Sequence, residues 1–252
     1  MTSVPELATF ATKLIGRGPV PPGTTHTHLT YISLRERIVA GNLAPGSKLN
    51  IAQLAAELSV SPGAVREALA MLEAEALVAS EPQRGFSVMP LTLDDVLALT
   101  EARVEIEKLC LSSAIAHGDI EWESAVVGAL HRLNRIEGQA ETVGRMSPEW
   151  TEAHKELHRA LASGCPNPWL LRVRELLYQQ SERYRQVSAP GVKGVRDVTG
   201  EHRKLVETAL SRDQQHVCRL IELHLSRTTE LVREALLIRD RKQDRSEHAH
   251  NP

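Results

Sequence analysis

Four histidines in the second half of the chain fall at positions that helices would bury. His154 and His158 are four residues apart in one helical pattern, so their rings share a helix face. His202 and His224 each lie on the apolar stripe of a later helical pattern. Imidazoles bind borderline divalent ions, and unused imidazoles fill a core poorly. The set therefore predicts a divalent metal site, with Zn²⁺ as first candidate and Ni²⁺ as second.

An arginine interrupts the apolar stripe of the helix predicted from Asp94 to His117. Arg103 occupies a position that should be buried, and a guanidinium there needs an anion. Two partners remain open, the carboxylate of Glu107 one turn further on or an acidic ligand bound from outside. Arg185 is a second candidate for this pocket, with a solvated helix face as its alternative. Both arginines are predicted effector-binding residues.

The segment from His154 to His158 also has the histidine spacing of zinc proteases. In that motif a glutamate acts as general base, but here Lys155 occupies its position and Glu156 lies one residue late. The sequence contains no P-loop, dinucleotide-binding glycine motif or nucleophile elbow. A metal-dependent hydrolase is therefore the disfavoured alternative, and we do not expect an enzyme.

The composition is that of a helical globular chain with room for two domains. The 252 residues are 42% hydrophobic and 25% charged, but only 3% aromatic, which favours helix over sheet. No run of 18 apolar residues and no secretory signal is present, so we expect a cytoplasmic protein without a membrane partner. The scattered thiols of Cys110, Cys165 and Cys218 predict neither disulfides nor a thiolate metal site.

Changes of pattern along the chain predict four segments. Residues 1–25 read as a flexible arm, 26–90 as a first domain, 92–238 as an all-helical second domain and 239–252 as a flexible tail. The first domain begins with a helix from His28 to Ala40 and a two-turn helix that includes Leu49 and Leu58.

A third helix follows after a tight turn. Ser61 is placed as its N-cap and Pro62 as its first residue. Its apolar stripe is made of Val65, Leu69, Leu72, Ala76 and Leu77. A separate face then carries Gly63, Arg66 and Ala70, one cation between small residues. This is the layout of a helix-turn-helix with a recognition helix.

Two short extended pieces, 78–81 and 86–88, follow this helix and predict a β hairpin. Gly85 can adopt the positive φ that the turn needs, and Arg84 lies at the tip. Residues 31–90 carry five basic and six acidic side chains, a charge of −1 that does not favour DNA. A three-helix packing module with a hairpin is thus the alternative to a DNA-binding winged helix.

The order of segments in this first domain resembles the winged helix-turn-helix of GntR-family bacterial transcription regulators. The segments that carry the resemblance are IVAGNLAPGSKL (38–49), LAAELSVS (54–61), VREAL (65–69) and QRGFSV (83–88). By this resemblance Ser61 and Arg66 fall where the family contacts DNA. The full set of expected DNA contacts is Arg37, Lys48, Ser61, Gly63, Arg66 and Arg84. Pro62 stands where the family commonly has arginine, which implies a deviating half-site preference.

The second domain resembles the all-helical FCD effector domain of the FadR subgroup. Metal-binding members place an acidic residue four before a histidine and use two further histidines on the last two helices. His158, His202 and His224 match those three histidines, whereas His154 stands in the acidic position. An alternative is a metal-free pocket in which the imidazoles hold the ligand. The segment DIEWESAVVGALHRL (119–133) resembles carbon-starvation-linked regulators of dicarboxylate or γ-aminobutyrate use.

Together these features predict a mainly α protein with a winged helix-turn-helix, a small β wing and a helical-bundle effector domain. The expected function is transcription regulation by a homodimer, most simply repression, on a pseudo-palindromic double-stranded DNA operator. A small organic acid bound near the metal and Arg103 would change the DNA affinity.

Overall fold

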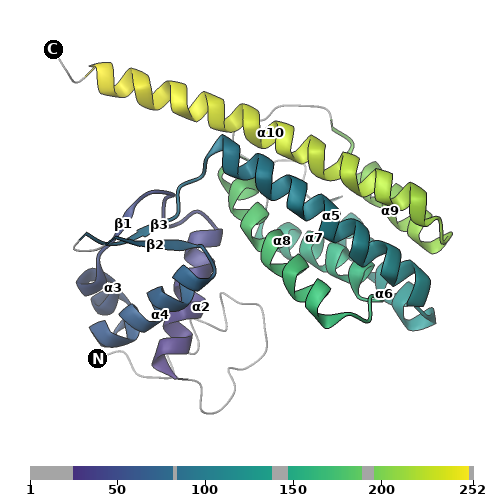
Figure 1. The fold of residues 1–252 in the computed structure, drawn as a ribbon, viewed down its shortest axis with the longest axis horizontal. Helices are drawn as coiled ribbons and strands as arrows, with labels where there is room; N and C mark the ends of the chain where they lie inside the picture. The colour runs from purple at the N-terminus through teal and green to yellow at the C-terminus, as the bar shows by residue number, and fades with distance from the viewer. Residues whose placement is uncertain (1–24, 82–83, 138–146, 189–195, 250–252) are drawn as a thin grey trace. The chain divides into compact units, whose positions relative to one another are not determined.

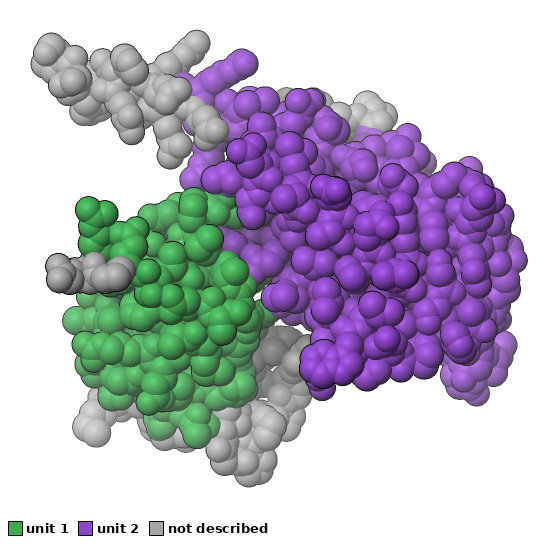
Figure 2. All heavy atoms as spheres, viewed as in Figure 1, with its two compact units in different colours: residues 1–91 green, residues 92–252 purple. Residues whose placement is uncertain are grey.

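The computed structural model describes residues 25–81, 84–137, 147–188 and 196–249. The chain divides into two units, Met1–Leu91 and Thr92–Pro252, which are coloured separately in Figure 2. All but the last residue of the predicted arm 1–25 lies outside the described residues.

Unit 1 contains short helices followed by a hairpin (Figure 1). Its elements in order are α2 (His26–Val39), β1 (Lys48–Leu49), α3 (Ile51–Leu58), α4 (Pro62–Ala74), β2 (Val78–Glu81) and β3 (Gly85–Val88). As predicted, Ser61 caps α4 by accepting a hydrogen bond of 3.1 Å from the backbone N–H of Ala64, and Pro62 is the first helical residue. Val65, Leu69 and Leu72 of α4 are fully buried in the core of this unit.

The sheet of unit 1 has three strands in the order β1-β3-β2, all antiparallel. Gly85 opens β3 with φ of +85°, as the predicted turn requires. The sequence prediction was wrong for Leu49, which pairs with Phe86 in the sheet and does not belong to the second helix. The reason is local, because the Asn50 side chain accepts from the backbone N–H of Gln53 and so starts α3 at Ile51.

Unit 2 is built from helices. They are α5 (Leu93–His117), α6 (Ile120–Glu137), α7 (Pro148–Ala162), α8 (Pro168–Ser188), α9 (Val198–Leu210) and α10 (Gln214–Ala249). In Figure 1, α5 and α10 run side by side. The sequence pattern predicts an end near Ile238, but α10 continues because residues 239–249 contain no glycine or proline and are rich in helix formers. The predicted fold class, a winged helix-turn-helix joined to a helical bundle, is confirmed.

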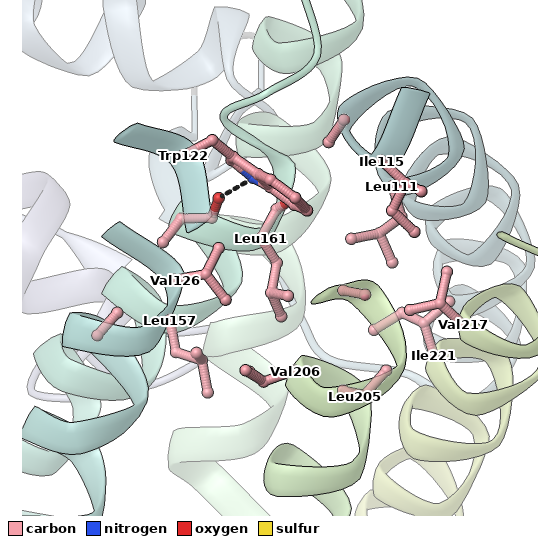
Figure 3. Packing of buried hydrophobic residues seen from close by; sticks show 14 of the residues in the cluster. Leu111, Ile115, Trp122, Val126, Leu157, Leu161, Leu205, Val206, Val217 and Ile221 are labelled. Atoms are coloured by element: carbon pink, nitrogen blue, oxygen red, sulfur yellow. Dashed lines mark hydrogen bonds between the residues drawn. The ribbon is translucent and has the colours of Figure 1, made fainter. Parts of the chain in front are cut away.

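The apolar core of unit 2 holds the helices that carry the histidines (Figure 3). Leu157 of α7, Leu205 of α9 and Ile221 of α10 are each at most 1% exposed. Each lies within one turn of a predicted site histidine on its own helix. Trp122 of α6 donates its indole N–H to the carbonyl of Ala160 at 3.0 Å, which ties α6 to α7. This packing fixes the relative positions of the histidines.

Candidate functional site

The structure brings the four predicted histidines together inside unit 2. His154 and His158 come from α7, His202 from α9 and His224 from α10, and all four are buried. One ring nitrogen from each lies within 4.8 Å of the corresponding nitrogens of the others. Neighbouring ring centroids are 4.6 Å apart for His154 and His158 and 4.9 Å apart for His202 and His224. We call this group the histidine cluster.

Several nitrogens of the histidine cluster are buried without a hydrogen-bond partner among the described residues. They are Nε2 of His158 and both ring nitrogens of His202. Burial lowers the pKa of each of the four rings, to about 2 for His202, and neighbouring positive charges lower it further. The rings are therefore neutral at ordinary pH. A neutral imidazole with a free lone pair is the form that binds a metal ion.

One ring of the cluster has a carboxylate partner. Nδ1 of His224 lies 2.9 Å from Oε2 of Glu201, and Glu201 also pairs with Arg196 at 2.6 Å and Arg227 at 2.9 Å. Burial raises the pKa of Glu201, but the hydrogen bonds from His224 and Arg196 and the charge of Arg196 outweigh burial and lower the pKa well below its usual range. Sequence reasoning missed Glu201, although it directly precedes His202 in α9.

Aromatic side chains border the cluster at His154. The ring of Trp150 stacks on His154 with centroids 4.7 Å apart, and the Tyr178 hydroxyl lies 3.2 Å from His154 Nδ1. Burial raises the pKa of Tyr178 well above its usual value, so its hydroxyl stays neutral. The guanidinium of Arg103 lies over the Tyr178 ring at 4.9 Å. Tyr178 thus lies between the histidine cluster and the predicted effector arginine.

Arg103 is buried, and its partner is the internal carboxylate that the sequence left as one of two options. Its Nη2 lies 3.6 Å from Oε1 of Glu107, whereas Arg174 of α8 contacts the same carboxylate more closely, at 2.8 Å. Nε of Arg103 and Nη2 of Arg174 have no hydrogen-bond partner among the described residues. Two buried guanidiniums thus share one carboxylate and keep N–H groups free. Arg174 was missed by sequence reasoning, although Arg174, Tyr178 and Glu182 recur every four residues on α8.

Arg185 does not lie on a solvated helix face, which corrects that alternative. The residue is 8% exposed, pairs with Glu182 at 2.5 Å and lies over the Trp150 ring at 4.9 Å. Arg185 is inward-facing because Trp150 of α7 and Glu182 of its own helix enclose it. Through Trp150, which stacks on His154, Arg185 is linked to the histidine cluster.

The residues predicted to contact DNA lie on the surface of unit 1. Ser61, Gly63 and Arg66 are exposed along the start of α4, and Arg66 forms no ion pair within the described part of the chain. Lys48 of β1 and Arg84 before β3 are also exposed, and Arg84 contacts Glu81 at 3.3 Å. Ala76 departs from the predicted stripe, because it lies beyond the end of α4 and is exposed.

Arg37 is the one member of this predicted set that the structure pairs across elements. Its guanidinium lies 3.2 Å from the carboxylate of Glu57 in α3. The thiols of Cys110 and Cys165 are buried, and that of Cys218 is partly buried.

The chain matches two family models. Residues 29–88 match the bacterial regulatory proteins of the gntR family, and residues 98–227 match the FCD domain. The HTH-type transcriptional regulator BphR of Paraburkholderia xenovorans is 37% identical over 224 residues, which are 88% of this chain and 91% of that protein. The HTH-type transcriptional repressor GlaR of Escherichia coli is 31% identical over 210 residues, or 82% and 95% of the two chains.

Solved structures share this fold. McbR/YncC of E. coli has a TM-score of 0.70 at 16% identity, over 84% of this chain and 98% of that one. A GntR regulator from Rhodococcus sp. RHA1 has a TM-score of 0.68 at 23% identity, over 84% and 99% of the two chains. Winged helix-turn-helix and helical effector unit together define a bacterial transcription regulator. The chain belongs to the GntR family, in the FadR-like subgroup whose members carry an FCD domain.

Membership in a family of regulators removes the hydrolase alternative. Lys155, in the position of the general base, lies 3.5 Å from Glu175, and Glu156 pairs with Arg159 at 2.9 Å. Neither side chain is therefore arranged as a base beside the histidines. Within the described residues, no helix is both long enough and apolar enough to cross a bilayer.

Proposed function

We propose that this protein is a cytoplasmic, homodimeric repressor whose affinity for a pseudo-palindromic operator is set by a small carboxylate bound in a metal-containing pocket of unit 2. The observation that carries the proposal is the buried histidine cluster beside guanidiniums with free N–H groups. The printed name of GlaR, a repressor at 31% identity, supports repression over activation. Assignment to the carbon-starvation-linked branch stays a prediction.

His154, His158, His202 and His224 would hold the ion. The unpartnered nitrogens of His158 and His202 fit this role, since buried polar atoms otherwise find hydrogen bonds. Four neutral imidazoles suit Zn²⁺ first and Ni²⁺ second. A bound divalent ion supplies a positive anchor for carboxylate oxygens.

The charges around the cluster favour an anionic effector. Arg103 and Arg174 are buried and share the carboxylate of Glu107, which leaves one positive charge in excess in this group of three described residues. A second carboxylate, from the effector, would neutralise this charge and accept from the free N–H of Arg103. Arg185 is the secondary effector contact.

DNA recognition would come from α4 and the wing of each protomer. Arg66 is the candidate for a guanine edge, because its guanidinium is exposed and unpaired in the described residues. The remaining expected contacts, which position the unit on the backbone, are Arg37, Lys48, Ser61, Gly63 and Arg84. Because the Ser61 oxygen accepts the cap bond, its hydroxyl proton remains available to a phosphate.

A metal-free pocket is the second candidate. In this version the excess guanidinium charge and the neutral imidazoles bind the carboxylate directly. Metal content of the tag-free protein, measured by mass spectrometry, decides between the two. We expect near-stoichiometric zinc or nickel that is lost in His158→Ala and His224→Ala. A folded protein without metal would leave the regulator assignment standing and favour direct anion binding.

A further inference from the structure

The hydrogen bond between His224 and Glu201 fixes where the ring proton lies. A carboxylate carries no hydrogen at ordinary pH, so the 2.9 Å contact between Nδ1 and Oε2 requires the proton on Nδ1. Nη2 of Arg196 also lies 3.2 Å from Nδ1, but the same Nη2 has closer acceptors in Glu201 Oε2 at 2.6 Å and the His224 carbonyl at 2.9 Å. His224 therefore donates from Nδ1, and its free lone pair is on Nε2.

Glu201 is held firmly in this arrangement by two arginines. Arg196 donates to both of its carboxylate oxygens, from Nε at 3.0 Å and from Nη2 at 2.6 Å. Arg227 donates to Oε1 at 2.9 Å. A carboxylate fixed by three hydrogen bonds from cations keeps both its position and its charge, so it can orient the ring in front of it.

His224 differs in this respect from the other members of the histidine cluster. Within the described residues, the Nδ1 of His154 contacts a tyrosine hydroxyl, whereas Nε2 of His158 and both ring nitrogens of His202 have no hydrogen-bond partner. The candidate ligand set itself contains no carboxylate. A divalent ion there would keep its full charge of two among neutral ligands. Among the described residues, Glu201 supplies a carboxylate that is hydrogen-bonded to a ring of the cluster.

We propose that Glu201 is the positioning residue of the metal site. It would hold His224 with Nε2 available for the ion, and it would supply from behind the ring the negative charge that the ligands lack. This inference rests on the metal site of the proposed function. Loss of a carboxylate behind a histidine ligand typically weakens metal binding by about 10- to 100-fold.

The test compares zinc affinity of full-length wild type and Glu201→Gln, measured at one pH by competition with a chromophoric chelator. We expect roughly 10- to 100-fold weaker binding in the variant. The matched control Glu207→Gln neutralises an exposed carboxylate on the same helix and should stay within about twofold of wild type, since it does not touch the ring.

A second readout does not depend on the variant's folding. In zinc-loaded wild type with ¹⁵N-labelled histidine, long-range proton–nitrogen spectra should show His224 protonated on Nδ1. Protonation on Nε2, or equal zinc affinity in Glu201→Gln, would overturn the role of Glu201. Wild type that binds neither zinc nor nickel would instead overturn the metal site itself and this inference with it.

Discussion

Glu107 is a buried carboxylate that pairs with two buried arginines. Its side chain is 1% exposed and lies between Arg103 and Arg174, which are themselves almost fully buried. Moving a charged side chain from water into the protein interior costs several kcal/mol of stability. An ion pair with an opposite charge offsets part of this cost, so an unpaired buried charge destabilises the fold. The excess of one guanidinium over the available carboxylates is therefore a cost in stability that an anionic effector could offset.

Glu107→Gln should strongly destabilise the metal-free protein. The two guanidiniums would lose their shared charge, at a cost of about 3 kcal/mol in the free energy of unfolding. Urea unfolding followed by circular dichroism measures this change. Glu105→Gln on the same helix, 68% exposed at its side chain, is the control and should cost at most about 0.5 kcal/mol. Equal effects of the two variants would contradict the buried-pair argument.

Arg66→Ala should weaken operator binding without changing the oligomeric state of the protein. Removal of one bidentate contact to a guanine costs about 1–3 kcal/mol per site, or roughly 5- to 150-fold in affinity. Fluorescence anisotropy with the promoter of the protein's own operon measures this, and sedimentation checks that the oligomeric state is unchanged. Glu67→Gln, the neighbouring exposed position, serves as comparison. If Arg66→Ala binds the operator as tightly as wild type, α4 is not the recognition helix.

At the scale of elements, α4 ends in a motif that usually contains glycine. The N–H of Leu77 donates to the carbonyl of Leu72 at 3.0 Å, and that of Ala76 to Glu73 at 2.9 Å, which is the pattern of a Schellman end. In this motif Ala76 has a left-handed backbone conformation, with φ of +55°. A left-handed backbone costs an alanine about 1 kcal/mol that glycine does not pay. The end of α4 is therefore strained.

Ala76→Gly should accordingly stabilise unit 1 by about 1 kcal/mol. Thermal unfolding monitored by circular dichroism gives the sign. Ala70→Gly, an exposed interior position of the same helix, should do the reverse and lower stability by about 1 kcal/mol. A destabilising Ala76→Gly would mean that the left-handed conformation is not adopted in solution.

Sequence periodicity predicts the helices well, because it reports which face of each helix is buried. Periodicity places the histidines on inward faces, and residue type places Ser61 as the cap and Gly85 in the turn. It does not predict β1, because two residues are too short to show a strand period. It also misses Glu201 and Arg174, since which charged side chains meet depends on how α9 packs on α10 and α8 on α5. Pairing between helices is a tertiary property.

On the scale of the whole molecule, the neutral histidine cluster makes stability depend on pH. In the unfolded chain each imidazole takes up a proton near pH 6.5. In the folded chain burial lowers these pKa values, to about 2 for His202. Unfolding therefore binds protons below about pH 6.5, and acid favours the unfolded state.

The metal-free protein should thus lose stability as pH falls from about 6.5 to 5, by up to about 1.4 kcal/mol per pH unit for each buried histidine. Above about pH 7.5 these groups contribute no slope. Urea unfolding of chelator-treated protein at several pH values measures this dependence of the free energy of unfolding on pH. His202→Asn should reduce the slope by about one proton. An unchanged slope in His202→Asn would contradict a neutral buried ring.

Regulation by a carboxylate requires coupling between the effector site and the DNA face, and equilibrium coupling is reciprocal. If a carboxylate raises the Kd for operator DNA by some factor, saturating operator must raise the Kd for the carboxylate by the same factor, typically about 5- to 150-fold. Anisotropy and calorimetry measure the two factors.

In Arg103→Met both of these factors should fall to about one, while operator affinity without carboxylate stays within about twofold of wild type. Glu107 keeps Arg174 as its partner in that variant, so the pocket loses the effector contact without an unpaired carboxylate. A carboxylate that still releases DNA from Arg103→Met would act elsewhere, for example by competing with phosphates, and its effect would then follow the salt dependence of DNA binding.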